Sequence, residues 1–302
     1  MANISVVIAV YNGAPFLREA LESVAAQSFL PFEIIIVDDG STDRTKGVVS
    51  TFSSAIPVSY HHQQNQGAGA ARNRGVVVAQ GEWIAFLDAD DVWFPHKLAV
   101  QIEHVGTHPE SQFVYSNVLV TDDTGRPARI VRQEVFEPLV FDGNPFAQLS
   151  TVLMRKDLFT RVGGFLSSLR LYEDLELYAR LARLAPMEFI AQNLATYRLH
   201  PAQSTKDHGQ QTASWLALMQ TLEEGWRPDK HRHAFVHNLL VRFCEEHSRH
   251  HLYAWNFPEA QQYGVLAFRY SRSWKNLRRL VASCVPGLRN LYYGIRPGPQ
   301  HE

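Results

Sequence analysis

Acidic side chains follow directly after two of the hydrophobic segments in the sequence. Residues 32–37 lead into the run Asp38-Asp39-Gly40-Ser41-Thr42-Asp43, and residues 83–87 lead into Asp88-Ala89-Asp90-Asp91. Carboxylates this close together repel one another unless a cation lies among them, and hard oxygen ligands favour Mg²⁺ or Mn²⁺. A metal held by one or two carboxylates keeps coordination positions for substrate phosphates. The spacing therefore predicts a site for a metal ion and a nucleoside diphosphate.

Each acidic run also has a simpler interpretation. Asp38 to Asp43 would serve as a strand-to-helix turn, with Gly40 in an unusual backbone conformation and Ser41 or Thr42 as the N-cap of a helix. Asp88 to Asp91 would serve as a solvated turn, and a single Asp-x-Asp is a weak signal. The two runs are harder to explain as turns when they recur after alternate elements of one sheet.

Alternating elements are predicted for the first hundred residues. Near-continuous apolar runs predict buried strands at residues 5–10, 32–37 and 83–87, with a short strand at 58–60 between them. Helical spacing predicts a helix over residues 16–24, another near Asp43 and a third over 68–78. This βαβαβαβ order predicts an α/β fold with a mostly parallel, Rossmann-like sheet, helices on both faces, and ligands at the carboxyl ends of the strands.

The pattern becomes less regular after residue 110. Residues 113–115 and 117–120 predict an antiparallel addition to the sheet before a turn at 122–125, and residues 151–154 predict another strand. Residues 162–165 are expected to form a loop and 173–185 a helix, and the chain beyond about Ser214 is mostly helical in pattern. We therefore expect a catalytic domain over residues 1–210 and a helical, basic C-terminal extension over 211–302.

Composition and charge exclude several classes of protein. The chain has 302 residues, of which 45% are apolar and 20% charged, so it is globular and not disordered. A formal net charge of −1 argues against a nucleic-acid binder. The charge is uneven, because residues 225–302 contain 12 basic and 5 acidic side chains, a net of +7, whereas residues 1–224 contain 17 and 25, a net of −8.

The expected location is the cytoplasm. Cys244 and Cys284 are the two cysteines, which is no disulfide framework. The first ten residues resemble a buried strand more than a signal peptide, and no segment is apolar enough to span a bilayer. Basic and aromatic residues mix in the tail, so residues 274–291 are the segment expected to contact the inner face of a membrane, if any does; Trp and Leu at helical spacing are more often core residues, and Arg is usually solvated. Three histidines of the tail are expected to be plain surface residues: His247, His250 and His251.

The run Gly67-Ala-Gly69-Ala-Ala-Arg72 resembles a dinucleotide-binding fingerprint, but Arg72 replaces its third glycine. That side chain would block the close packing of helix on strand that glycine allows. A guanidinium here suits a phosphate or the edge of a base. An ordinary helix start with an exposed arginine also remains open.

Taken in order, five motifs resemble family 2 glycosyltransferases with the GT-A fold, and the resemblance covers roughly residues 3 to 205. Gly163-Gly164-Phe165 and Tyr197-Arg198-Leu199-His200 add to it. The five motifs are Val10-Tyr11-Asn12, residues 37–43, residues 65–73, residues 86–91 and Glu173-Asp174.

The resemblance implies a role for each motif residue. Asp174 would be the general base, Asp39 would contact the nucleobase with Tyr11 near it, and Asp88 would approach the ribose. Asp90 would bind the divalent metal, Mn²⁺ or Mg²⁺, and His200 could reach the metal or a phosphate, although a histidine in a polar loop is as often structural. The residues expected around the nucleotide sugar are Val10, Tyr11, Asn12, Asp39, Gly67, Arg72, Asp88, Ala89, Glu173 and Arg198. Glu173 and Asp174 would also suit a helix start, where acidic residues favour the dipole.

The expected activity is transfer of one hexosyl residue, with inversion, from a nucleoside-diphosphate sugar to an acceptor hydroxyl. UDP is the default nucleotide of the family, and the acceptor would be a saccharide or a lipid-linked saccharide of bacterial cell-surface polysaccharide or lipopolysaccharide synthesis. The chain lacks the Gln-x-x-Arg-Trp motif of processive relatives. Two alternatives remain: a non-catalytic protein of the same fold that binds sugar nucleotides, and an NAD(P)-dependent Rossmann enzyme.

Overall fold

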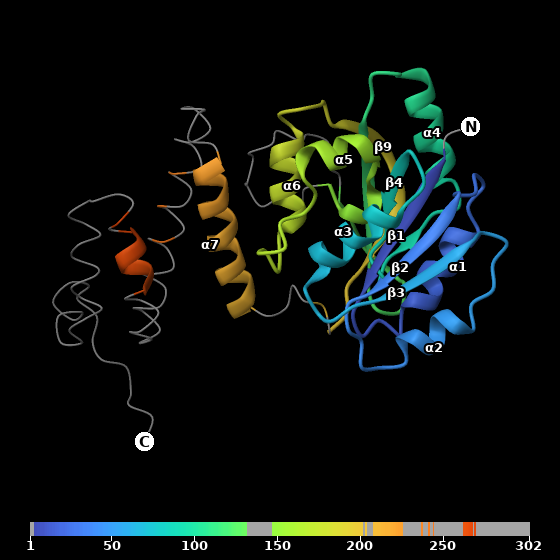
Figure 1. Ribbon diagram of the computed structural model, residues 1–302, viewed down its shortest axis with the longest axis horizontal. Helices are drawn as coiled ribbons and strands as arrows, with labels where there is room; N and C mark the ends of the chain where they lie inside the picture. Colours follow the sequence, from blue (N-terminus) through green and yellow to red (C-terminus); the bar gives the residue numbers. More distant parts are fainter. Residues whose placement is uncertain are drawn as a thin grey trace. The chain divides into compact units, whose positions relative to one another are not determined.

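The computed structural model describes residues 3–131, 147–201, 203 and 208–225, together with 237, 241, 244, 262–267 and 269 (Figure 1). The chain divides into two compact units, Met1–Ser214 and Trp215–Glu302. The boundary expected after residue 210, with catalysis assigned to the first part, stays a prediction.

Four parallel strands form one half of the sheet in the first unit (Figure 1). They are β1 (Ile4–Val10), β2 (Glu33–Asp38), β3 (Val58–His62) and β4 (Trp83–Phe86), in the order β3-β2-β1-β4. Val10 lies opposite Asp38, and Asp38 lies opposite His62. Because Val7 pairs with Phe86, the chain leaves β1, β2 and β4 at the same edge, so both acidic runs begin there as the sequence predicts.

The other half of the sheet is mixed. β4 pairs antiparallel with β8 (Leu153–Arg155), and β8 pairs antiparallel with β6 (Phe113–Thr121). β9 (Glu188–Arg198) runs parallel to β6 and pairs with the short β5 (Val92–Trp93), while β7 (Pro127–Val131) is antiparallel to β6. The predicted antiparallel addition is confirmed, although residues 113–120 belong to one strand and not two. The strand predicted over residues 151–154 begins two residues later, at Leu153, because Thr151 ends the 3₁₀ helix η1 (Leu149–Thr151).

Helices cover both faces of the sheet. Val6, Ile8 and Val10 of β1 pack in one cluster with Leu17 and Leu21 of α1 (Leu17–Ala25). Alternate residues of a strand point to opposite faces, and on the other face α3 (Ala68–Val78) packs on β1 and β2. Four further helices lie among the residues described between Thr45 and Leu181: α2 (Thr45–Ser50), α4 (Lys97–Thr107), α5 (Lys156–Val162) and α6 (Glu173–Leu181). The helix expected over residues 173–185 thus ends earlier, at Leu181.

Helical structure is also present where the tail is described. α7 (His208–Gly225) ends in the second unit, and residues 262–267 are helical. Cys244 is buried with a free thiol. No helix among the described residues is both long and apolar enough to cross a membrane. The predicted membrane segment at 274–291, the histidines at 247, 250 and 251, and Cys284 lie outside the described residues.

Gly75 allows α3 to lie close against the sheet, and its substitution by alanine should destabilise the protein. A Cβ atom at Gly75 would clash with Val7 Cγ1 of β1 and lie 3.4 Å from Val37 Cγ2 of β2. We expect Gly75→Ala to lower the free energy of unfolding by about 1–3 kcal/mol, the usual cost of overpacking a core.

Gly47 of α2 provides the matched control, because nothing lies within 4 Å of its Cβ position. Gly47→Ala should leave stability unchanged or raise it by up to about 1 kcal/mol, since alanine loses less entropy in a helix. Urea unfolding of the two variants beside the parent chain measures both values. Equal stability of the two variants would contradict the close packing of α3.

Candidate active site

The acidic loop after β4 meets the end of β9. Pairing of Val92 with Thr196 brings residues 88–91 beside residues 198–200. His200 Nε2 lies 2.9 Å from Asp90 Oδ2, and the His200 ring packs on Phe16 with 4.4 Å between ring centroids. Burial and the charge of Asp88 raise the pKa of Asp90, while the His200 contact opposes this rise. The structure therefore brings together both residues that the sequence assigns to the metal.

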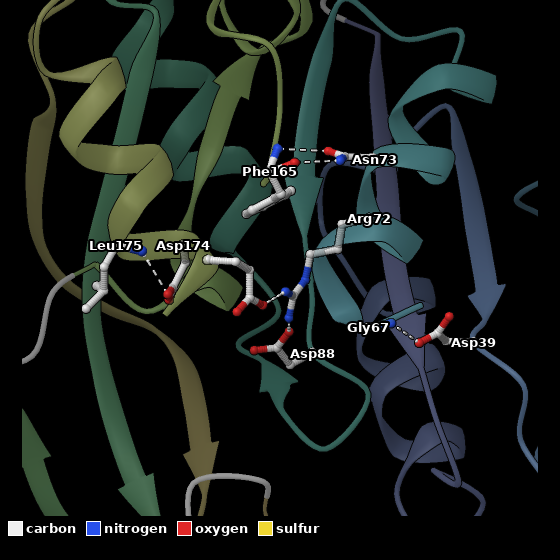
Figure 2. Close-up of polar contacts among 9 residues, drawn as sticks. Asp39, Gly67, Arg72, Asn73, Asp88, Phe165, Asp174 and Leu175 are labelled. Atoms are coloured by element: carbon white, nitrogen blue, oxygen red, sulfur yellow. Dashed lines mark hydrogen bonds and ion pairs between the residues drawn. The ribbon is translucent and has the colours of Figure 1, made fainter. Parts of the chain in front are cut away.

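Arg72 joins two carboxylates at the centre of the site (Figure 2). Its Nη1 donates to Glu173 Oε1 at 2.5 Å, its Nη2 donates to Asp88 Oδ1 at 2.7 Å, and its guanidinium lies 5.6 Å from the centroid of the Phe165 ring. Burial alone would lower the pKa of Arg72, but the charges of Asp88 and Glu173 outweigh burial and raise it. The arginine at the third-glycine position is thus neither exposed nor free, but locked in a buried ion-pair network.

The loop before α6 is fixed on α3 next to this arginine. The Asn73 side chain donates to Phe165 O at 2.8 Å and accepts from Phe165 N–H at 2.9 Å, as Figure 2 shows. These two bonds join segments that are 92 residues apart in the chain. They place the start of α6, and with it Glu173, over the start of α3.

Asp174 lies in the first turn of α6 and remains partly exposed. Burial, and after it the charge of Glu173, raises the pKa of the Asp174 carboxyl to about 7. Arg72 and the Leu175 N–H, which donates to Asp174 Oδ1 at 2.8 Å, act in the opposite direction. A carboxyl group that titrates near neutral pH is suited to accept a proton in catalysis. The helix-start role and the role of a base are therefore compatible at this residue.

Asp39 holds the loop that leads into α3. Its carboxylate accepts from Gln63 Nε2 at 2.8 Å, from Gln66 N–H at 2.9 Å and from Gly67 N–H at 2.7 Å. Gly67 has φ +94°, which favours glycine, and a Cβ there would lie 3.0 Å from Arg170 Nη1. Figure 2 shows the hydrogen bond between Asp39 and Gly67, which is separate from the ion pair between Arg72 and Asp88.

The other residues predicted to surround the nucleotide sugar do not join the ion-pair network of Arg72. Val10 is buried in the core and Tyr11 is 54% exposed. Asn12 Oδ1 accepts from Thr42 N–H at 2.8 Å, so Asn12 ties the end of β1 to the acidic loop after β2. The Arg198 side chain is buried against Phe16 and bonded to Glu19, while Ala89 is half-buried.

Asp90 and His200 are in direct contact, and their chemistry suits a metal ion. The 2.9 Å between their ligand atoms matches the edge of about 3 Å in an octahedron with metal–ligand bonds of about 2.1 Å. In the described part of the chain, no three His, Cys, Asp or Glu side chains gather into a group that could hold an ion by themselves. This pair would thus hold an ion whose other ligands come from phosphates or water, as is usual for Mg²⁺.

Comparison with known proteins gives the family. The profile of glycosyl transferase family 2 matches residues 5–163, and the chain belongs to this family. An uncharacterized glycosyltransferase of Nostoc sp. is 34% identical over 210 residues, which cover 66% of this chain and 65% of the relative. One from Rickettsia typhi is 30% identical over 223 residues, 71% of this chain and 70% of the relative. One from Rickettsia conorii is 28% identical over 233 residues, and the match covers 73% of this chain but only 39% of that longer protein.

Solved structures show the fold. S. aureus TarS residues 1–349 in complex with UDP-GlcNAc superimpose with a TM-score of 0.66 at 18% identity, covering 93% of this chain and 79% of that one. The mannosyltransferase PcManGT of Pyrobaculum calidifontis in complex with GDP-Man and Mn²⁺ gives 0.60 at 17% identity, covering 97% and 81%. The expected GT-A-like α/β fold is confirmed, and family membership removes the reason for the NAD(P) alternative.

Proposed function

We propose that this protein transfers a single hexosyl residue from a nucleoside-diphosphate sugar, by default UDP-linked, to an acceptor hydroxyl with inversion of the anomeric centre. The observation that carries the proposal is Asp174, whose pKa of about 7 suits a general base and which lies beside the buried network of Arg72, Asp88 and Glu173.

The acidic loops supply the donor side of the proposed site. Asp39 and the loop from residue 63 to Gly67 would hold the nucleobase, with Tyr11 beside it, and Asp88 would approach the ribose. Two solved relatives in fold carry UDP-GlcNAc or GDP-Man with Mn²⁺, which supports a nucleotide-sugar donor and a metal here. Asp90 and His200 would hold Mn²⁺ or Mg²⁺, which when bound stabilises the negative charge that grows on the departing diphosphate.

The side chains of this protein would then perform a direct displacement. The oxygen of the acceptor hydroxyl attacks the anomeric carbon from the face opposite the nucleoside diphosphate, which leaves with the electrons of the broken bond. Asp174 accepts the proton of that hydroxyl as the new bond forms. Arg72 holds Glu173 and Asp88 in place while this happens. Because one carboxylate serves as the base and no second one must act as nucleophile, the displacement is single and inverts the anomeric centre.

The acceptor and pathway are part of the same proposal. Relatives of this chain come from bacteria such as Nostoc, Rickettsia and Bacillus subtilis. We extend the proposal to a saccharide or lipid-linked acceptor in bacterial cell-surface polysaccharide or lipopolysaccharide synthesis. The basic segment 274–291 would then contact the inner face of the membrane.

Binding of UDP sugars in the presence of Mn²⁺ should raise the melting temperature. A ligand at 100 times its dissociation constant adds about 2.7 kcal/mol of stability, and for a catalytic domain of this size each kcal/mol is worth about 2–4 °C. Melting temperatures with a panel of UDP, dTDP and GDP sugars, with and without Mn²⁺, measure binding. Release of the nucleoside diphosphate in the presence of an acceptor then measures transfer. NAD(P) should give no shift. A shift with NAD(P) and none with any nucleotide sugar would contradict the proposal, and binding without transfer to any acceptor would favour the non-catalytic alternative.

A further inference from the structure

A buried serine hydroxyl lies behind the acidic loop. Ser150 in η1 is fully buried, and its Oγ accepts from Asp88 N–H at 3.1 Å and donates to Asp91 Oδ2 at 2.5 Å. Its carbonyl accepts from Trp93 Nε1 at 2.7 Å, which fixes the backbone at the same point. One hydroxyl thus bonds both ends of the run from Asp88 to Asp91, the loop that carries Asp90.

Asp91 extends this support to the other side of the proposed metal site. The residue is 1% exposed, and its second oxygen accepts from Arg198 N–H at 3.2 Å. Arg198 lies two residues before His200, whose ring contacts Asp90. The Asp91 carboxylate therefore joins the two segments that carry the metal-binding residues.

A buried carboxylate next to two others is costly for the fold. Asp91 is 1% exposed, and Asp88 and Asp90 lie in the same short loop. A neutral side chain of the same shape would avoid this cost, so stability alone does not account for an aspartate at this position. Its two oxygens nevertheless have exact partners, in Ser150 and the Arg198 backbone.

We propose that Ser150 and Asp91 are positioning residues that hold Asp90 and His200 at the spacing needed for the metal ion and the diphosphate. This inference rests on the proposed function. Neither residue touches the ion in this arrangement, and both act through the groups that do. Outer residues that orient metal ligands typically change metal affinity by 10- to 100-fold when they are removed.

Binding of Mn²⁺ in the presence of UDP tests the proposal without any turnover. The electron paramagnetic resonance signal of free Mn²⁺ is followed as the full-length protein is added. We expect Ser150→Ala to raise the Mn²⁺ concentration at half-saturation by about 10- to 100-fold. The matched control is Ser116→Ala, because Ser116 of β6 is also fully buried and its Oγ donates to Asn117 O at 3.2 Å. This control should bind Mn²⁺ as the parent chain does.

Asp91→Asn separates positioning from folding. The amide keeps the shape of the side chain and one acceptor but loses the charge, so this variant should melt no lower than the parent chain and still bind Mn²⁺ more weakly. If Ser150→Ala fails to fold, Mn²⁺ binding by Asp91→Asn tests the positioning role in its place. Parent-like Mn²⁺ binding by folded Ser150→Ala, or by Asp91→Asn when Ser150→Ala is unfolded, would overturn the positioning role. Failure of the parent chain itself to bind Mn²⁺ with UDP would count against the metal in the proposed function.

Discussion

Asp174→Asn should lower kcat by about 100- to 10,000-fold, the usual contribution of a general base. The amide cannot take up the proton of the acceptor hydroxyl, but it keeps the volume of the side chain and an oxygen for the Leu175 N–H, which donates to Asp174 at 2.8 Å. Affinity for the nucleotide sugar should stay close to that of the parent chain, because the donor contacts of the proposal lie on other residues. Initial rates and donor titration by calorimetry give the two values.

The pH dependence gives this prediction a direction. The base must be ionised, and its pKa is raised to about 7, so kcat/KM should rise with pH up to about 7 and level off above it. A carboxyl with a raised pKa holds its proton more tightly in the folded than in the unfolded chain. The contribution of Asp174 to stability therefore falls as pH rises from about 4, its unfolded value, to about 7, and stays low above that. At pH 8 Asp174→Asn should be at least as stable as the parent chain.

Asp157 provides the matched control for Asp174. It also lies in the first turn of a helix, α5, and its Oδ1 accepts from the next N–H, that of Leu158, at 3.0 Å. Asp157→Asn repeats the change in an exposed position, where the carboxylate pairs with Arg155 and not with the network of Arg72. An equal loss of activity in the two folded variants, or parent-like activity of Asp174→Asn, would rule out the base.

The parallel half of the sheet could be predicted because its signals are local. β1 and β2 are continuous apolar runs, and α3 occupies the predicted residues, Ala68–Val78. A strand that is buried on both faces is apolar along most of its length, so its sequence reveals it. The position of both acidic runs at one edge follows from parallel pairing alone.

Elements whose inner face is polar were not predicted. α4 buries Lys97 and Gln101, which interrupt the apolar stripe of a typical amphipathic helix. Burial lowers the pKa of Lys97 well below its ordinary value, and its Nζ donates to Gln101 Oε1 one turn further along α4 at 2.7 Å and lies 4.1 Å from the centroid of the Trp93 ring. β5 has only two residues, which is too short for a pattern of alternating polar and apolar residues. The pairing between β6 and β9 shifts register near Asn117, which a sequence pattern does not reveal.

The site could be predicted as a set of residue types but not as a network. The motifs identify Arg72, Asp88 and Glu173, but the pairing of Arg72 with Glu173 spans 101 residues and depends on how the loop after α5 packs on α3. Ser150 carries no signal in the sequence, because a serine before a strand is common and its bonds to Asp88 and Asp91 exist only after folding.

Arg72→Met should lower the free energy of unfolding by about 3–5 kcal/mol, because it leaves buried Glu173 without a partner for its charge. Removing one member of a buried ion pair costs more than the pair contributes, since the remaining charge stays desolvated. Arg72→Lys should be only a partial replacement, because an ammonium group cannot present the planar fork that reaches both Glu173 and Asp88. Urea unfolding at pH 8 measures these losses.

Arg155 provides the matched control for Arg72. It also pairs with two carboxylates and lies 5.6 Å from an aromatic ring, that of Trp83, but its side chain is 36% exposed, against 10% for Arg72. Ion pairs that remain in contact with water contribute about 0–1 kcal/mol, so Arg155→Met should cost little. Similar losses in the two variants would show that burial does not matter at Arg72.

The double variant Arg72→Met with Glu173→Gln distinguishes the lost bond from the stranded charge. The amide of glutamine is far less costly to bury than a carboxylate, so the double variant should recover a large part of the stability that Arg72→Met loses. Activity should not recover with it. Arg72 also lowers the pKa of Asp174, so without the guanidinium the rise of kcat/KM should move to higher pH, while removal of the Glu173 charge moves it back. A double variant no more stable than Arg72→Met, with an unshifted pH profile in both, would mean that Arg72 is held by packing and not by charge.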